Sequence, residues 1–198
     1  MTRLGIAEWV RNVSQPVILP IVKLLANWGV HPHLVTIICF LGFLVSSFFI
    51  MQGDFIIAGL ILIFFAPLDA IDGALARYTN KVTAFGAFLD SVLDRYGEIL
   101  VFLGFTWYFI MKGSVSGIIL SFLGITGSLM VSYTRARAEG VGIDCKVGLF
   151  TRFERVTFLI LALIFDLIFL FLIFIAFFSH FTAVQRIWHV YNQSKTSS

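Results

Sequence analysis

The feature that most constrains this chain is a succession of apolar runs, each long enough to cross a lipid bilayer. A membrane-spanning helix needs about 20 mainly apolar residues, and such runs occupy residues 34–51, 55–78, 82–111 and 115–135. A further apolar stretch, 156–190, contains one acidic residue, Asp166, and we expect a tight turn there between a short fifth helix and a longer sixth. The sequence therefore predicts an all-α integral membrane protein with six transmembrane helices in a bundle over residues 34–190.

The composition excludes a soluble domain. Of the 198 residues, 59% are hydrophobic and 13% are charged, whereas soluble domains carry about a quarter charged residues. No internal repeat or low-complexity linker divides the chain. We therefore expect residues 1–198 to form a single membrane domain.

Residues 1–30 have a different pattern from the later runs. Apolar residues such as Ile6, Val10, Val13 and Val17 recur at three- and four-residue steps, with charged residues such as Arg11 between them. This spacing predicts an N-terminal amphipathic helix that lies on the membrane surface. An ordinary first helix packed on the bundle is the alternative.

The Lys and Arg residues gather on one side of the predicted topology. If the six spans leave both termini on the same side, only Lys112 of the 14 Lys and Arg residues lies on the opposite side, and Arg95 lies within the third span. Lys and Arg are enriched in cytoplasmic segments, so we expect a multi-pass protein of the cell membrane with both termini and the active site on the cytoplasmic side. The net charge of +3 follows from this bias and indicates no nucleic-acid partner.

Four aspartates lie where a membrane protein rarely places charge. Asp69 and Asp72 are three residues apart, and Asp90 and Asp94 are four apart, so each pair shares one face of its helix. The intervening chain can end one helix, turn near Asn80 and begin an antiparallel neighbour, which lets the two acidic faces meet. Carboxylates that converge in a low-dielectric region need cations, and oxygen ligands without His or Cys favour Mg²⁺ or Mn²⁺.

The same segment resembles the CDP-alcohol phosphotransferase family, whose pattern D-x2-D-G-x2-A-R-x8-G-x3-D-x3-D it matches at every fixed position. The resemblance implies two Mg²⁺ or Mn²⁺ ions per active site, held by Asp69, Asp72, Asp90 and Asp94. It implies a CDP pocket formed by Asp69, Asp72, Gly73, Ala76, Arg77 and Gly86. For Gly73 and Gly86, tight helix packing is the alternative explanation. Before the first span, His33 stands where family members often have Asn.

The resemblance also implies an activity. Family members transfer a phosphatidyl-type group from a CDP-linked lipid to a polar alcohol and release CMP, and they are homodimers. Asp90 and Asp94 would then be the catalytic residues, with Asp94 as the general base that takes the proton of the acceptor hydroxyl. The expected partners are the lipid donor, a small phosphorylated polyol and the surrounding membrane lipids.

A cluster of arginines follows the fourth span and indicates which acceptor is used. Arg135, Arg152 and Arg155 lie in segments that resemble the R-A-R-A-E…G…E-R-x-E-R pattern of members that use inositol phosphate. These are the phosphatidylinositol-phosphate and archaetidylinositol-phosphate synthases. The resemblance implies that the three arginines contact the phosphate of the acceptor, a role that suits the planar guanidinium group. Positive-inside charge with nearby glutamates as partners is the alternative.

Other functions remain open at this point. Within the family, glycerol 3-phosphate could be the acceptor, or the member could use CDP-inositol, and the donor could be CDP-diacylglycerol or CDP-archaeol. A small cation transporter would also explain acidic residues in the membrane. It would not explain the Gly-Ala-Arg spacing, and transporters favour midplane sites between repeated halves, whereas this chain has no repeat.

Overall fold

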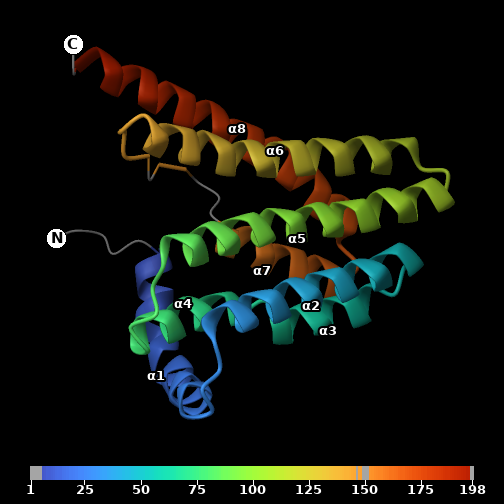
Figure 1. Cartoon of the computed structure of the whole chain (residues 1–198). Coiled ribbons are helices and arrows are strands. Elements are labelled where there is room, and N and C mark those ends of the chain that lie inside the picture. Colours follow the sequence, from blue (N-terminus) through green and yellow to red (C-terminus); the bar gives the residue numbers. More distant parts are fainter. Residues whose placement is uncertain (1–5, 146, 149–151, 197–198) are drawn as a thin grey trace.

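The computed structural model describes residues 6–145, 147, 148 and 152–196, with side chains described from Pro16 onward except for Val17 and Thr196. These residues form eight helices and no strand, which confirms the all-α prediction. The helices are α1 (Ile6–Asn27), α2 (Pro32–Gln52), α3 (Phe55–Phe65), α4 (Leu68–Tyr78), α5 (Ala84–Met111), α6 (Val115–Gly140), α7 (Arg152–Ile164) and α8 (Ile168–Thr196) (Figure 1).

Four stretches of the described chain are long and apolar enough to cross a membrane, by length and composition. They are Pro32–Gln52, Phe55–Tyr78, Val115–Gly140 and Ile168–Lys195. Helix α5 has 28 residues, but Asp94, Arg95 and Glu98 lie in its middle, and α7 has only 13 residues. The chain is thus a helical membrane-type protein, and the count of six spans stays a prediction.

Two of the predicted turns are confirmed by the backbone. Asn80, between α4 and α5, and Asp166, between α7 and α8, both have φ of 55°. Asn and Asp adopt this left-handed conformation more readily than other residues with a side chain. The division of the last apolar stretch at Asp166 is therefore correct.

The predicted second span is broken into two helices, which the run of apolar residues did not reveal. Helix α3 ends at Phe65 and α4 begins at Leu68, with Pro67 between them. Proline has no N–H to donate to the carbonyl of Ile63, and its ring crowds that carbonyl, so a helix rarely continues through it undisturbed. As a result, Asp69 lies in the first turn of a new helix and not in the middle of a long one.

The fourth predicted span, residues 115–135, continues further as a helix than the apolar run indicated. Helix α6 continues through Arg135 to Gly140, so this arginine is helical. The extra turn consists of good helix formers, and Arg135 Nε lies 2.8 Å from Glu139 Oε1, an i,i+4 pair that supports a helix. The helix ends at Gly140, because glycine is a poor helix former.

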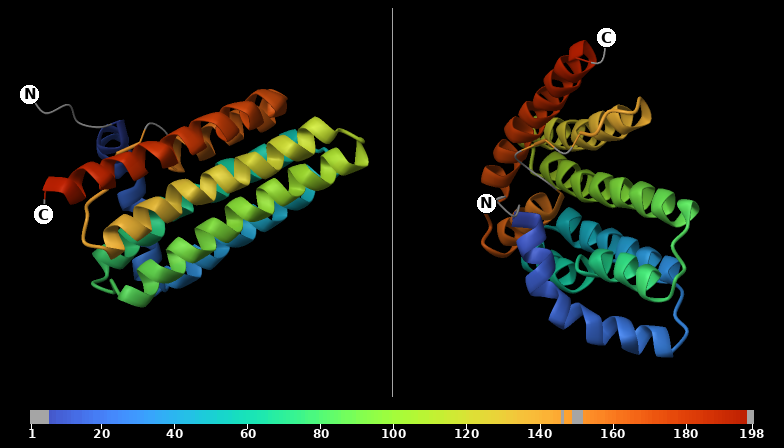
Figure 2. Two further views of the ribbon diagram at one scale, coloured as in Figure 1. Left: turned by 90° about the horizontal axis from the view of Figure 1, so that it is seen from above. Right: turned by 90° about the vertical axis from the view of Figure 1, so that its left-hand side faces the viewer.

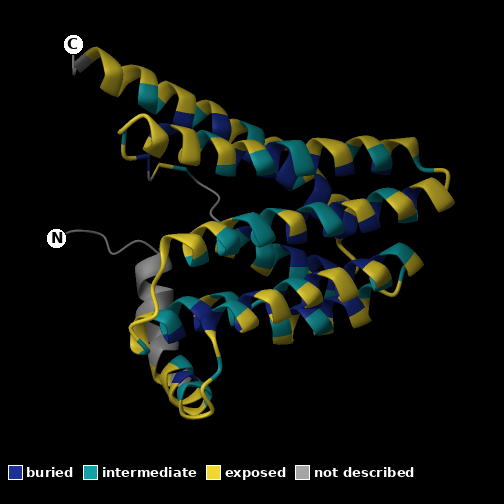
Figure 3. Cartoon of the chain, in the orientation of Figure 1, coloured by how far each residue is buried: buried dark blue, intermediate teal, exposed yellow. Residues whose placement is uncertain are grey.

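The helices pack around an aromatic-rich core. Helix α2 lies along α5 and α3, and α6 lies along α8 and α5. At Gly104 of α5, an added Cβ would lie 2.8 Å from the Ser47 carbonyl oxygen of α2, so this glycine permits the close approach of the two helices. The side chains of Phe105 and Phe171 are fully or almost fully buried in this core, and exposed residues cover the outward-facing sides of the helices (Figure 3).

Helix α1 does not join the bundle lengthwise. It crosses the end of the bundle that also contains the α4–α5 turn, whereas the α2–α3 and α5–α6 turns lie at the opposite end (Figures 1 and 2). Its Val22 is buried against Val35, Ile71 and Leu75, while Trp28, just beyond the helix, is exposed. The N-terminal segment therefore contains a helix over Ile6–Asn27. Its amphipathic place on a membrane surface stays a prediction, and residues 1–5 of the segment lie outside the described residues.

Candidate active site

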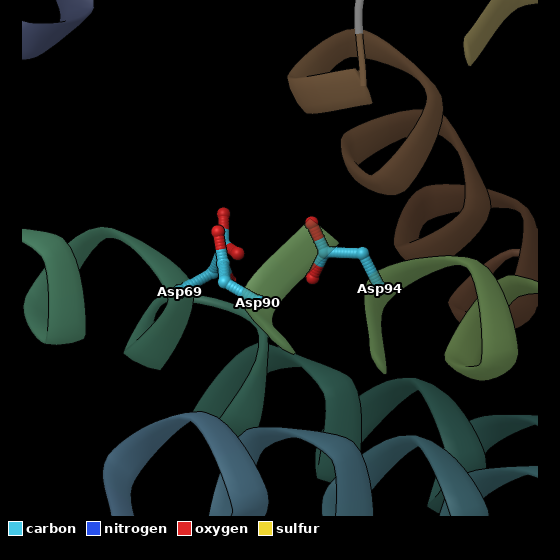
Figure 4. A group of neighbouring side chains, drawn as sticks. All are labelled: Asp69, Asp90 and Asp94. Carbon is cyan, nitrogen blue, oxygen red and sulfur yellow. The ribbon is translucent and has the colours of Figure 1, made fainter. Parts of the chain in front are cut away.

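Three of the four predicted aspartates converge at the end of the bundle where α4 meets α5. Asp69 comes from the first turn of α4, and Asp90 and Asp94 come from successive turns of α5. One carboxylate oxygen from each residue lies within 4.8 Å of the other two. Figure 4 shows the three carboxylates on the same side of the α4 and α5 ribbons. The helix-face argument from sequence spacing is confirmed for this trio.

Asp72 lies beside the trio, but its carboxylate is held elsewhere. Its Oδ2 accepts a hydrogen bond of 2.7 Å from Thr36 Oγ1 of α2, and the residue is buried. It is not among the three residues whose oxygens come within reach of one another. All four aspartates nevertheless line one pocket, together with Thr36, Cys39, Phe40, Phe43, Leu93 and Arg152. Thr36 is thus a site residue that the sequence prediction lacks.

Arg152 supplies the positive charge in this pocket. Its Nη1 lies 2.5 Å from Asp69 Oδ1, and its Nη2 lies 2.5 Å from Asp94 Oδ1. The guanidinium therefore bridges a carboxylate of α4 and a carboxylate of α5. This arginine was expected near an acceptor phosphate, and the structure brings it directly to the aspartates from α7, 83 residues along the chain from Asp69.

The oxygens of the trio suit a divalent cation. Asp90 Oδ1 is buried and has no hydrogen-bond partner among the described residues, and such an atom is costly unless a cation or water satisfies it. The nearby donor set is made of carboxylates, which favour Mg²⁺ and Mn²⁺ over softer metals. Asp69 is more accessible than Asp94, with 36% of its side chain exposed compared with 11%.

A second ion pair, which is more deeply buried, lies one helical turn further along α5. Arg155 Nη2 of α7 donates to Glu98 Oε1 of α5 over 2.9 Å, and the two side chains are 6% and 10% exposed. Ser128 Oγ of α6 donates to Glu98 Oε2 over 2.8 Å. Glu98 and Ser128 are absent from the sequence prediction. A signal existed, because Glu98 continues the four-residue step of Asp90 and Asp94, and a membrane helix rarely carries a carboxylate without a partner.

Of the other arginines, Arg95 Nη1 lies 3.5 Å from Asp94 Oδ2, whereas Arg135 and Arg186 bond to other groups. Arg135 is half exposed at the end of α6 and pairs with Glu139. Arg186 of α8 is buried; it donates to the carbonyl oxygens of Val131 and Val147, and so links the segment after α6 to the bundle. The sequence indicated only topology for Arg186.

The remaining residues of the family pattern flank the pocket without lining it. Gly73, Ala76 and Arg77 lie along α4, and Gly86 lies in the first turn of α5. An added Cβ at Gly73 would meet only the Arg77 side chain, at 3.4 Å, so helix packing does not require this glycine. At Gly86, an added Cβ would lie 2.8 Å from the His33 ring, so packing contributes to the choice of glycine there.

Together, the fold and the site define a helical membrane protein with an acidic, arginine-bridged pocket at one end of its bundle. The chain belongs to the CDP-alcohol phosphatidyltransferase family, whose model matches residues 29–189. It is therefore a membrane transferase of that type, and not a cation transporter.

Individual relatives support the same assignment. The archaetidylinositol phosphate synthase of Pyrococcus horikoshii is 38% identical over 84% of this chain and 86% of that protein. The crystal structure of Mycobacterium tuberculosis phosphatidylinositol phosphate synthase with CDP-DAG bound has a TM-score of 0.82 at 26% identity, covering 89% of this chain and 94% of that one. The same mycobacterial enzyme in complex with manganese and citrate has a TM-score of 0.80 at 27% identity, covering 88% of each chain.

Proposed function

We propose that this protein transfers a phosphatidyl-type group from a CDP-linked lipid to an inositol phosphate and releases CMP. The observation that carries the proposal is the pocket in which Asp69, Asp90 and Asp94 face one another and Arg152 reaches them from α7. The matched relatives are archaetidylinositol phosphate and phosphatidylinositol phosphate synthases, which supports inositol phosphate as the acceptor.

The metal ions belong to this proposal. Asp69, Asp72, Asp90 and Asp94 would hold two Mg²⁺ or Mn²⁺ ions, and the unpartnered Oδ1 of Asp90 supports this assignment. When bound, such ions stabilise the charge on the attacking and leaving oxygens of a phosphoryl displacement. The manganese complex of the mycobacterial relative supports the same metal class. The bond from Thr36 fixes the Asp72 carboxylate before any ligand arrives.

Asp94 is the proposed general base. It takes the proton of the acceptor hydroxyl, whose oxygen forms a bond to the lipid-linked phosphorus of the donor, while the bond from that phosphorus to the CMP oxygen breaks. Asp94 is less exposed than Asp69, so bulk water has less access to its carboxylate. Asp90, one turn earlier on α5, is the second proposed catalytic residue, because it would hold a metal ion next to Asp94.

The phosphate of the acceptor would be bound by arginines. Arg152 is the first of these, because it already lies at the aspartates, and a guanidinium group can bind a phosphate through two parallel hydrogen bonds. Arg135 would reach the phosphate from the end of α6. The expectation that Arg155 also contacts this phosphate stays a prediction, and its buried pairing with Glu98 favours the different role argued below.

The CDP moiety is proposed to bind along α4 and the start of α5. Asp69, Asp72, Gly73, Ala76, Arg77 and Gly86 would form its pocket. The open space at Gly73 supports this assignment, because a side chain there would meet only Arg77. At Gly86, the nearby His33 ring also leaves little room for a side chain.

Topology and assembly complete the proposal. We expect one domain over residues 1–198, with six spans and with both termini and the active site facing the cytoplasm. The exposed apolar side chains of Leu19, Leu24 and Trp28 support a surface position for the N-terminal segment 1–30. A homodimer is part of the proposal, and native mass spectrometry of the detergent-purified protein tests it.

The activity is tested by measuring CMP release from purified protein with Mg²⁺. CDP-diacylglycerol and CDP-archaeol are offered as donors, each with inositol 1-phosphate, glycerol 3-phosphate or free inositol as acceptor. We expect release with inositol 1-phosphate and little with free inositol, which has no phosphate for the arginines. Preference for glycerol 3-phosphate would assign the chain to a phosphatidylglycerophosphate-type activity. Release of CMP from CDP-inositol with a lipid alcohol as acceptor would reverse the roles of donor and acceptor.

A further inference from the structure

Helices α5 and α7 are connected by two arginine–carboxylate pairs, one above the other. On α5, Asp94 and Glu98 are separated by one helical turn; on α7, Arg152 and Arg155 are also separated by about one turn. Arg152 pairs with Asp94 over 2.5 Å, and Arg155 pairs with Glu98 over 2.9 Å. The two pairs therefore set the register of α7 relative to α5.

The two pairs differ in their surroundings. The Arg152 pair is open, since 25% of the arginine side chain is exposed and Asp69 shares the same guanidinium. The Arg155 pair is enclosed by the bundle, and Ser128 donates to the remaining carboxylate oxygen of Glu98. Only the outer pair can exchange its partner for a ligand without exposing a buried charge, because removing one member of a buried pair leaves the other uncompensated.

Helix α7 needs such a fixed point. It has 13 residues and packs against α3 and α8, so its first turn approaches the aspartates through long arginine side chains. The position of Arg152 at the mouth of the pocket therefore depends on where Arg155, one turn further along the helix, is held. Glu98 holds it.

We propose that Glu98 is a positioning residue for the acceptor site: through Arg155 it fixes the first turn of α7, so that Arg152 reaches the carboxylates and the acceptor phosphate. This inference rests on the proposed function, because it assumes that Arg152 binds the acceptor. It assigns Arg155 to the support of Arg152 and not to direct contact with the phosphate.

The test is a double-mutant cycle. The variants Glu98→Gln, Arg155→Gln and the double variant are purified, and kcat and KM are measured for the acceptor and for the CDP-linked donor. If the pair acts as one positioning unit, all three variants lose acceptor kcat/KM to a similar extent, about tenfold to a hundredfold for the loss of one charged hydrogen bond at the substrate. The donor KM stays within about twofold in each.

Direct contact by Arg155 would give a different pattern and would overturn the inference. Glu98→Gln alone would then leave the acceptor KM unchanged or lower it by releasing the arginine, whereas Arg155→Gln would raise it. Asp54→Asn is the matched control, because it makes the same acid-to-amide change at an exposed position before α3, at the opposite end of the bundle. It should leave both KM values unaltered.

The double variant keeps the test decisive if a single variant fails to fold. Replacing a buried ion pair by a neutral pair of similar size is often tolerated, so Glu98→Gln/Arg155→Gln is expected to yield folded protein. Wild-type acceptor kinetics in that variant would refute the positioning role. Failure of the proposed function is distinguishable, because the wild-type protein itself would then release no CMP with inositol 1-phosphate.

Discussion

Arg152 bonds to two of the carboxylates that a divalent cation would use. Removal of this arginine should therefore strengthen metal binding. The guanidinium bonds to Asp69 Oδ1 and Asp94 Oδ1, and so occupies two of the three carboxylates that lie close enough together to share a cation. A cation bound there would be repelled by the guanidinium and would have to displace it. We therefore predict that Arg152→Gln binds Mn²⁺ more tightly than the wild-type protein, although it removes a residue that the reaction needs.

The magnitude follows from the contacts. A hydrogen bond to a charged group contributes about 1.5–3 kcal/mol. Water screens part of this attraction, because 25% of the Arg152 side chain and 36% of the Asp69 side chain are exposed. Because of this screening, we take about 1.5 kcal/mol for the two bonds together. A difference of about 1.4 kcal/mol corresponds to a tenfold change in affinity. The Kd for Mn²⁺ should fall by about tenfold.

The assay measures free Mn²⁺ by electron paramagnetic resonance during titration of the purified protein, with no donor or acceptor present. Arg135→Gln is the matched control: it removes the same charge from the end of α6, where the arginine is half exposed and paired with Glu139, and it should leave the Kd within about twofold. In parallel, Arg152→Gln should raise the acceptor KM by about tenfold or more. A variant with damaged folding would not tighten metal binding while weakening the acceptor, and an unchanged or higher Kd for Mn²⁺ would refute competition at these oxygens.

The remaining predictions concern the aspartates and Arg135. EDTA should abolish CMP release, and Mg²⁺ or Mn²⁺ should restore it; full activity in chelator would contradict the metal site. Asp69→Asn or Asp90→Asn should lower kcat/KM by at least several hundredfold, since each variant removes a charged ligand. Asp94→Asn should lower kcat by roughly 10²–10⁴-fold, as expected for loss of a general base, while a titration with CDP-linked lipid still shows near-normal affinity. Arg135→Ala should raise the acceptor KM by about tenfold without changing the donor KM, and an equal change in both values would assign this arginine to topology alone.

The part of the site that the sequence predicts is the part set by helical periodicity. Asp90 and Asp94 must share a face of any helix that contains them, and Asp69 falls opposite them once the chain turns near Asn80. The turn at Asp166 is predictable for a similarly local reason, because an acidic residue interrupts an otherwise apolar stretch. These predictions need no knowledge of how distant helices pack.

The part that the sequence does not predict depends on contacts between distant segments. The bond from Thr36 to Asp72 joins residues 36 positions apart, and the Glu98–Arg155 pair joins residues 57 positions apart. Spacing along one helix cannot indicate which of several arginines will meet a given carboxylate. The break at Pro67 is different, since the proline was visible in the sequence but lay inside a run whose hydrophobicity alone satisfied the length of a span.

The charges in the pocket explain why the proposed reaction depends on metal ions. Asp69, Asp72, Asp90 and Asp94 carry four formal negative charges, and Arg152 carries one positive charge, which leaves −3 among the pocket-lining residues. The neighbouring Glu98–Arg155 pair is neutral. Arg95 lies 3.5 Å from Asp94 Oδ2 but does not line the pocket, so it is not part of this sum. A donor with a diphosphate and an acceptor with a phosphate would both be repelled by that charge. Two divalent cations change the sum from −3 to +1, and a pocket of that charge attracts both anionic substrates while Asp94 remains available for the hydroxyl proton.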